Sequence, residues 1–351
     1  MSHALTNRDL SELLALRAEE VEGQRQRAYR RAARAAMYWP EEAAALVEQD
    51  LPLTDLHGIG PRLSGRIKAW LEDPPPVPEP PPSRAGFMTF ARARAIVQAN
   101  PEWQDGLRGD LQMHTHYSDG KMTVEEMAFA ARDLGHEYVA ITDHSVGLKI
   151  AGGMSADELA QQRREIDALN ERLASDESGF TVLRSLEMNL DVEGRGDMEE
   201  VTADLDIVVG SFHSKLRGTE DQTERYVRAL SNPTFQILGH PRCRMFNSRL
   251  GLHADWPVVF EAAASFGKAI ELNAHPNRQD LNAEVIALAA DSSSLFSIGT
   301  DAHAPWELEF VPMALAAAIE AGLDRDRIVN FMPVDELREW VARTRAEARG
   351  P

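Results

Sequence analysis

Apolar and polar residues alternate in two different ways along this chain, and the change of pattern divides it. In residues 1–72 the apolar positions recur with helical spacing, as in Leu10, Leu13 and Leu14. From Leu107 onward, short apolar runs alternate with amphipathic segments, the pattern of a parallel α/β architecture. The sequence therefore predicts a small all-α domain followed by an α/β domain.

The second pattern locates individual elements. Strands are expected near residues 108–113, 138–142, 181–187, 206–212, 235–239, 268–273 and 295–300. Helices are expected between them, near residues 123–134, 155–174, 219–230, 255–266, 281–290 and 312–321. Repeated strand–helix units in one closed domain predict a barrel related to the eight-stranded type, in which the chemistry lies at the carboxyl ends of the strands.

A proline-rich stretch separates the two patterns. The run from Asp73 to Pro82 is typical of a semi-rigid polyproline-II linker. We therefore expect a helical domain at residues 1–72, a linker at 73–86 and the α/β domain at 87–351, with one helix from Phe87 to Val97 at its start.

Charge and composition narrow the choice of partners. The net charge is −19, and it is uneven: residues 1–72 carry 10 Lys and Arg against 11 Asp and Glu, while the remainder carries 27 against 45. Because binding to nucleic acid needs a basic face, we expect any nucleic-acid binding site in the first domain. The sequence has no run of eighteen apolar residues and no secretory leader, so we expect no membrane contact. It has a single cysteine, Cys243, which favours a cytoplasmic protein. The oligomeric state is left open.

One stretch of the first domain carries a candidate nucleic-acid contact. Between Leu53 and Ile67, two apolar-periodic segments are joined by Gly-Ile-Gly, and Pro61 stands where a second helix would begin. Free N–H groups at a helix start suit a phosphate. The stretch resembles a helix-hairpin-helix, a motif that binds DNA backbone without sequence preference; the alternative is a plain packing corner. The resemblance implies these DNA contacts: Gly58, Ile59, Gly60, Arg62, Arg66 and Lys68.

The first domain as a whole, including the run from Arg27 to Ala33, resembles the N-terminal helical domain of bacterial family-X DNA polymerases. That family often uses a lysine of the second hairpin helix as a Schiff-base nucleophile for lyase chemistry. The matching position is Arg66, whose guanidinium stays protonated, and Lys68 lies two positions away. We therefore expect no lyase activity. Too few residues follow the linker for a polymerase palm and fingers, so polymerisation is not expected either.

Two histidines at the end of the first predicted strand are the first metal candidates. His114 and His116 are two residues apart, and residues two apart in a strand share a face. Asp119 follows in a Ser-Asp-Gly turn. Imidazole and carboxylate ligands together suit Zn, Mn or Fe. Polar surface residues are the alternative for this segment taken alone.

The same feature recurs at the end of one predicted strand after another. A metal-type residue follows or ends six of the seven predicted strands, at the end that a barrel brings to one mouth. The further candidates are His144, Glu187, His213, His240, Asp301 and His303. Chance placement of all of them at strand ends is improbable, so the sequence predicts one metal centre.

This set of motifs resembles the PHP superfamily (polymerase and histidinol phosphatase), and most of all the C-terminal PHP domain of family-X polymerases. The motifs are Gly109 to His114, Gly239 to Pro241, Glu271 to Arg278 and Thr300 to His303. The resemblance implies a distorted seven-stranded (β/α)7 barrel that binds up to three divalent metal ions, preceded here by the helix-hairpin-helix domain.

The resemblance also implies which residues share an ion. The first set is His114, His116, Glu187 and Asp301; the second is Glu187, His213 and His240; the third is Asp119, His144 and His303. One departure is Asn189, where the family prefers an aspartate.

These ligands point to phosphate-ester hydrolysis, because adjacent divalent metals acidify a bridging water and neutralise the phosphoryl group. Lys215, Arg244 and Arg278 are candidate phosphate anchors, with surface salt bridges as the alternative. We expect a hydrolase acting on DNA ends or gapped DNA in repair: a 3′–5′ exonuclease, with 3′-phosphatase or abasic-site endonuclease activity as variants. The alternatives are a small-molecule phosphatase, for example on histidinol phosphate or a nucleotide, and a DNA-recruiting module whose metals are structural.

Overall fold

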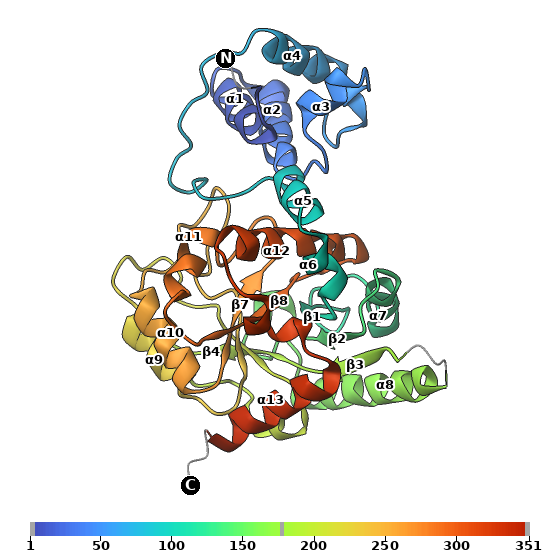
Figure 1. Ribbon diagram of the computed structural model, residues 1–351, viewed down its shortest axis with the longest axis vertical. Helices are drawn as coiled ribbons and strands as arrows, with labels where there is room; N and C mark the ends of the chain where they lie inside the picture. Colours follow the sequence, from blue (N-terminus) through green and yellow to red (C-terminus); the bar gives the residue numbers. More distant parts are fainter. Residues whose placement is uncertain (1–3, 176–178, 348–351) are drawn as a thin grey trace. The chain divides into compact units, whose positions relative to one another are not determined.

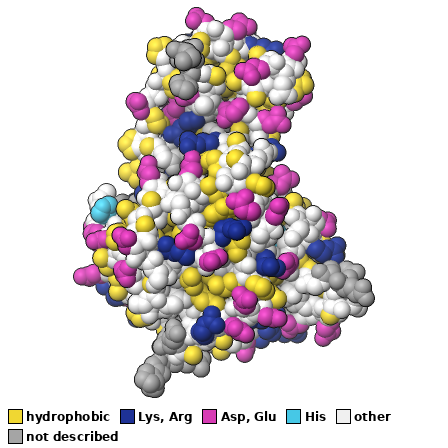
Figure 2. Space-filling view, in the orientation of Figure 1, with side chains coloured by type: hydrophobic (Ala, Val, Ile, Leu, Met, Phe, Trp, Pro, Cys, Tyr) yellow, Lys and Arg dark blue, Asp and Glu magenta, His cyan; other side chains and the backbone are white. Residues whose placement is uncertain are grey.

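The computed structural model describes residues 4–175 and 179–347. The chain folds as two compact units, residues 1–100 and residues 101–351. Within the described residues, no helix combines the length and the apolar character that crossing a membrane requires. Acidic side chains are spread over both units on the face drawn in Figure 2, interspersed with Lys and Arg, as the net charge of −19 leads one to expect.

The first unit is helical, as the apolar spacing predicts. It contains α1 (Asn7–Glu19), α2 (Gly23–Ala36), α3 (Ala43–Glu48), α4 (Pro61–Glu72) and α5 (Phe90–Gln98). A capping box fixes the start of α1, because Thr6 accepts from the Asp9 N–H while the Asp9 side chain accepts from Thr6. The buried core joins α1, α2 and α4 through Leu10, Ala32 and Ile67, all fully buried.

The predicted hairpin stays a prediction: a 3-10 helix, Leu53–Asp55, precedes its turn and α4 follows it. Gly58 adopts φ +80°, a conformation that other residues rarely take. Gly60 is the N-cap of α4, and Pro61 occupies its first turn.

The proline-rich segment is tied to the first unit. The Arg84 guanidinium forms an ion pair with the buried carboxylate of Glu12 on α1 at 2.7 Å, and Arg8 donates to the Arg84 carbonyl at 2.7 Å. α5, which we had expected in the second domain, also lies in the first unit. The predicted domain boundaries at residues 72 and 87 stay predictions, but the end of the segment is held to α1 through Arg84.

The second unit is an α/β fold whose strands pair in parallel throughout (Figure 1). One sheet has the order β1 (Gly109–Met113), β2 (Tyr138–Ile141), β3 (Thr181–Arg184); the other has the order β4 (Glu187–Leu190), β5 (Val209–Phe212), β6 (Ile237–Leu238), β7 (Ala269–Asn273), β8 (Leu295–Gly299). One helix precedes the strands, α6 (Pro101–Gly106), and one follows the last of them, α12 (Val311–Glu320). The helices between strands are α7 (Val124–Asp133), α8 (Ala156–Ala174), α9 (Thr223–Leu230), α10 (Trp256–Ser265) and α11 (Ala283–Ile286). The α/β prediction is confirmed.

One predicted strand is split in two. The run expected at 181–187 is β3 plus the start of β4, with a break at Ser185 and Leu186. β3 pairs with β2, whereas β4 pairs with β5, so the chain changes sheets at this break. An apolar run does not reveal such a change of partner.

Backbone hydrogen bonds join the two sheets at two places, between the ends of β1 and β8 and between the loop after β2 and the start of β4. His114 N–H donates to the Ala302 carbonyl at 2.8 Å and Asp301 N–H to the Gln112 carbonyl at 2.9 Å, which links the ends of β1 and β8. On the other side, Ser145 N–H donates to the Glu187 carbonyl at 3.0 Å. Both junctions lie at residues that the sequence marked as functional or at their neighbours.

The amino ends of the strands are covered by apolar packing. α13 (Val334–Glu347), which we did not predict, buries Leu337, Trp340 and Val341 in one cluster with strand residues such as Leu111 and Ile237. Its apolar positions recur at helical spacing, so the signal was present in the sequence. The carboxyl ends are thereby left for the loops that carry the polar residues.

Candidate metal centre

The carboxyl ends of five strands each present a predicted ligand. His114 directly follows β1, His213 follows β5, and His144, His240 and Asp301 come two or three residues after β2, β6 and β8. Because parallel strands end at the same edge, these side chains converge. The sixth, Glu187, opens β4 at the point where the chain changes sheets.

Glu187 lies at the middle of the cluster and is fully buried. Its Oε1 lies 2.8 Å from His240 Nε2 and 3.3 Å from His213 Nε2. Its Oε2 lies 3.0 Å from His144 Nδ1 and 3.5 Å from His114 Nε2. One carboxylate thus faces four imidazoles.

A second set of contacts extends the cluster toward solvent. His114 Nε2 also lies 3.1 Å from Asp301 Oδ1. Asp119 Oδ1 lies 3.2 Å from His303 Nε2 and 3.6 Å from His144 Nε2. Asp119 and His303 have 38% and 26% of their side chains exposed, so the network runs from a buried carboxylate to an open edge.

Three groups within this network have ligand atoms that all lie within 4.8 Å of one another. They are His114, Glu187 and Asp301; His144, Glu187 and His213; and His114, Asp119, His144 and His303. Each group shares most of its members with one of the three predicted ligand sets. The first lacks the predicted His116, the second has His144 in place of His240, and the third also contains His114. His240 reaches the same network through its contact with Glu187.

His116 is the predicted ligand that the structure does not bring into the cluster. It is exposed, and its ring lies 4.7 Å from that of Tyr117. The expectation rested on the two-residue period of a strand, but β1 ends at Met113 and the chain turns at Thr115 to Ser118. The period no longer holds beyond that end.

The buried atoms of the cluster fit a bound cation. His114 Nδ1, His144 Nδ1, Glu187 Oε2 and His213 Nε2 are buried without a hydrogen-bond partner among the described residues. Burying polar atoms without a hydrogen bond is costly. Imidazole nitrogens and carboxylate oxygens that converge in this way are the donor set of a borderline divalent metal such as zinc, manganese or iron.

The electrostatics of the cluster keep its carboxylates ionised. Burial acts to raise the pKa of Glu187, but His144, His213 and His240 outweigh it and hold that pKa well below the usual value. Burial likewise opposes ionisation of Asp301, yet the neighbouring Arg278 and His114 hold its pKa well below the usual value. Burial lowers the pKa of His213 to about 4, so this imidazole is neutral and able to donate its lone pair.

Neighbouring polar residues orient the cluster. Asn189 Oδ1 lies 3.2 Å from His213 Nδ1, which leaves Nε2 of that ring facing Glu187. Asp143 accepts from the Thr115 N–H at 2.8 Å and from Gln162 at 2.6 Å, which fixes the turn after β1.

Two residues of β7 were quoted only as part of a motif and given no role of their own. Glu271 accepts from the backbone N–H of His240, and Asn273 Nδ2 donates to Glu271 at 3.2 Å and to Asp301 at 3.3 Å. The sequence could have indicated a role for both residues, because they are polar and stand two apart in an otherwise apolar buried strand.

The predicted phosphate anchors have different environments. Arg278 pairs with Asp301 through Nε at 2.6 Å and keeps 18% of its side chain exposed. Arg244 is buried, whereas Lys215 is exposed in the loop after His213. Their roles toward a substrate stay predictions.

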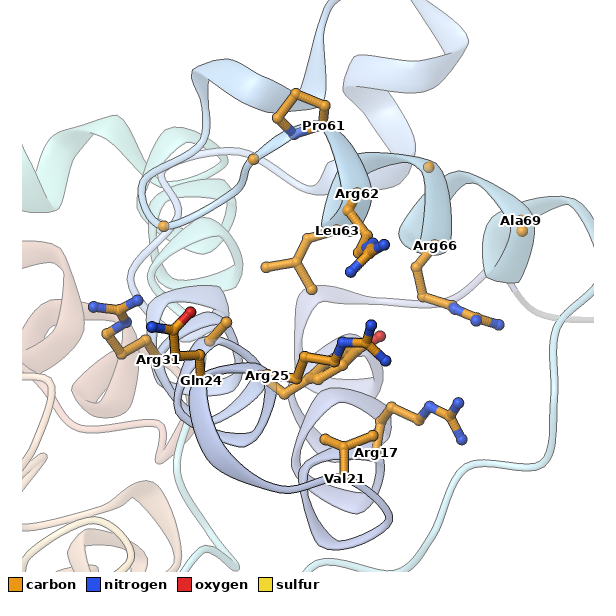
Figure 3. Close-up of a pocket in the computed structure, with 15 residues that line it drawn as sticks. Arg17, Val21, Gln24, Arg25, Arg31, Pro61, Arg62, Leu63, Arg66 and Ala69 are labelled. Atoms are coloured by element: carbon orange, nitrogen blue, oxygen red, sulfur yellow. The ribbon is translucent and has the colours of Figure 1, made fainter.

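The first unit has a pocket of its own, about 770 Å³ in volume, beside the predicted hairpin. It is lined by Gly58, Gly60, Arg62 and Arg66, which we predicted, and by Arg17, Arg25 and Arg31 from α1 and α2. Figure 3 shows the guanidinium groups of Arg17, Arg25, Arg62 and Arg66 at one end of the pocket in that view, with Arg31 apart from them. Ile59 lies in the apolar core instead, and Lys68 is not among the lining residues.

Comparison with known proteins identifies the α/β unit. Residues 110–275, which span β1 to β7, match the family described as PHP domain. The chain contains a PHP domain. The resemblance drawn from the strand-end motifs is therefore confirmed for this region, and the likeness of residues 1–72 to a helix-hairpin-helix domain stays a prediction.

Relatives of this PHP domain carry different names. The DNA polymerase/3′-5′ exonuclease PolX of Bacillus subtilis (strain 168) is 35% identical over 239 residues, which cover 68% of this chain and 41% of PolX. A probable phosphatase of Thermoanaerobacter sp. (strain X514) is 28% identical over 255 residues, 68% of this chain and 97% of that protein. The chain thus spans under half the length of PolX but nearly the whole phosphatase.

A solved structure shows a more distant likeness. The histidinol phosphate phosphatase of Lactococcus lactis subsp. lactis, crystallised with zinc, L-histidinol and phosphate, is 14% identical with a TM-score of 0.43, over 62% of this chain and 94% of that one.

Proposed function

We propose that this protein is a metal-dependent phosphoesterase that hydrolyses phosphate esters at DNA ends or gaps, acting in repair as a 3′–5′ exonuclease. Release of a 3′-phosphate and incision at abasic sites are chemically equivalent reactions of the same site. The observation that carries the proposal is Glu187, a buried carboxylate facing the imidazoles of His114, His144, His213 and His240.

We assign up to three divalent ions to the cluster. The residues that would hold them are His114, His116, Asp119, His144, Glu187, His213, His240, Asp301 and His303. For His116 this requires its exposed ring to turn inward from beside Tyr117. When bound, the ions supply an acidified water as nucleophile and neutralise the developing charge on the phosphoryl oxygens. The same reading treats the two joined sheets as one distorted barrel of seven strands, with β3 and β4 as a single interrupted strand.

The protein's own residues position the ester. Arg278 stands beside Asp301 and offers its remaining guanidinium N–H groups to a phosphoryl oxygen. Lys215, exposed after β5, is suited to the next phosphate along a strand. Arg244 adds buried positive charge in the loop after β6.

The arginine-lined pocket of the first unit favours DNA as the substrate over a small phosphate ester. The pocket is lined by the apolar side chains of Val21 and Leu63 as well as by guanidinium groups. Such a surface binds phosphates of any nucleic-acid sequence, and a small phosphomonoester has no need of it.

The test is hydrolysis of a 5′-labelled oligonucleotide, single-stranded and duplex, by Mn- or Zn-loaded protein, beside a panel of small phosphomonoesters. The Arg62→Ala/Arg66→Ala variant, which leaves the metal cluster unchanged, is assayed in parallel. We expect a ladder of shortened oligonucleotides that weakens in the variant. Intact oligonucleotides together with phosphate release from small esters would refute the DNA proposal.

A small-molecule phosphatase is the second candidate, and two observations favour it. The probable phosphatase of Thermoanaerobacter aligns with this chain over 97% of its own length. The net charge of −19 also disfavours high affinity for DNA, because DNA is itself negatively charged. Histidinol phosphate and nucleotides are the esters to include first.

A further inference from the structure

Trp306 lies three residues after the predicted ligand His303 and is largely uncovered. The residue is 55% exposed. It belongs to the 3-10 helix Pro305–Phe310, which begins two residues after His303. The His303 N–H donates to Glu307 Oε2 at 2.6 Å, so this helix is folded directly against the turn that carries a predicted ligand.

A row of rings leads from the cluster to this tryptophan. His275 lies 6.1 Å from Phe310, and Phe310 lies 5.6 Å from Trp306, both in edge-to-face arrangements. His275 interacts electrostatically with Asp301 and His303. Phe310 therefore supports the buried edge of Trp306, while the remainder of the indole faces solvent at the rim of the site.

The strand order places basic residues on the loops that follow in order from the loop of this ring. β8, whose loop carries Trp306, pairs with β7, whose loop carries Arg278. The loops of β6 and β5, next in order, carry Arg244 and Lys215. A flat apolar ring beside a row of cations is complementary to a nucleotide, whose base has a π-face and whose phosphate is an anion.

We infer that Trp306 is a stacking platform for the nucleobase adjacent to the scissile ester. This inference rests on the proposed function. It adds a binding site for the nucleobase, which the metal cluster does not contact. Stacking on an aromatic side chain accepts every base and favours an unpaired end over a paired one. The geometry thus assigns the site to single-stranded or frayed ends.

The experiment removes the Trp306 ring and the substrate base, each separately and both together. Wild type and Trp306→Ala, both as full-length Mn-loaded protein, are assayed on 5′-labelled dT10 and on the same strand with abasic residues at its two 3′-terminal positions. We expect the substitution to raise KM on dT10 by about 5- to 100-fold with little change in kcat. On the abasic strand, wild type and variant should have the same KM, because the ring has no base to stack on.

Two further variants separate stacking from general damage. Trp306→Phe keeps a flat ring and should recover part of the lost affinity for dT10. Leu134→Ala removes a side chain of similar exposure, 47%, at the opposite end of the strands and should match wild type on both substrates.

The other outcomes are equally decisive. Equal KM values for wild type and Trp306→Ala on dT10, with cleavage intact, overturn the stacking role and leave the exonuclease proposal standing. An equal loss on dT10 and on the abasic strand assigns Trp306 to local structure and also overturns it. If wild type cleaves neither strand, the proposed function falls and the inference falls with it.

Discussion

The carboxyl group of Glu271 accepts a hydrogen bond from the backbone N–H of His240. His240 needs such support, because its φ of +24° lies in the left-handed region that non-glycine residues rarely adopt. Asn273 extends the contact from Glu271 to Asp301, whose φ is +56°. Two predicted ligands with uncommon backbone conformations are thus held by one pair of side chains on β7.

Replacing Glu271 tests this support. Burial raises the pKa of Glu271 to about 8, so the carboxyl already holds a proton near neutral pH. Glu271→Gln, which keeps an acceptor oxygen, should therefore bind metal nearly as wild type does. Glu271→Leu removes the acceptor and should weaken zinc binding by about 10- to 100-fold, measured by competition with a chelating dye. If Glu271→Leu binds zinc as tightly as wild type, Glu271 does not support the ligands.

Glu187→Gln tests the centre of the cluster. The substitution keeps the shape of the side chain but removes the negative charge shared by four imidazoles. We expect loss of bound metal, measured by elemental analysis after gel filtration, and a fall in turnover of about 1000-fold. The matched control is Glu137→Gln, an exposed carboxylate that pairs with Arg108 at the other end of β2. Full metal content and normal turnover in Glu187→Gln would exclude this residue as a ligand.

Salt dependence tests the arginine pocket. If Arg62 and Arg66 each neutralise one phosphate, Arg62→Ala/Arg66→Ala should reduce the slope of log K against log salt by about 1.5 on single-stranded DNA. Arg27→Ala is the control, because Arg27 is exposed on α2 but does not line the pocket. The measurement is fluorescence anisotropy of a labelled oligonucleotide from 50 to 200 mM salt, roughly the range over which counterion release dominates. An unchanged slope would place the DNA contact elsewhere.

Several parts of this molecule could be predicted from sequence because the signal is local. An apolar run that ends in His, Asp or Glu marks a strand and its carboxyl end together, and His144, His213 and Asp301 were found in this way. The turn before α4 and the start of that helix could be predicted because Gly58 suits a positive φ and Pro61 suits the first turn of a helix.

Other features depend on contacts between distant segments and leave no local trace. At the break between β3 and β4 the chain changes its pairing partner from β2 to β5. The break lies at Leu186, an apolar residue whose type does not indicate such a change. The pocket joins Arg17 of α1 to Arg66 of α4, residues that only folding brings together. The structure places the His116 ring beside Tyr117, because β1 ends at Met113 and the strand period does not extend to residue 116. Its role as a ligand stays a prediction.

His136 gives a pH test that is separate from the metal cluster. It precedes β2, at the opposite end of the strands from the cluster, and burial lowers its pKa to about 4, against about 6.5 in an unfolded chain. Between these values the unfolded state binds more protons, so stability is fully present above pH 6.5 and is lost as the pH falls toward 4, by about 3 kcal/mol in total. His136→Gln cannot take up this proton. The free energy of unfolding in urea should therefore fall more steeply for wild type than for His136→Gln between pH 6.5 and 4.5. Parallel curves for the two proteins would mean that His136 titrates normally in the folded state.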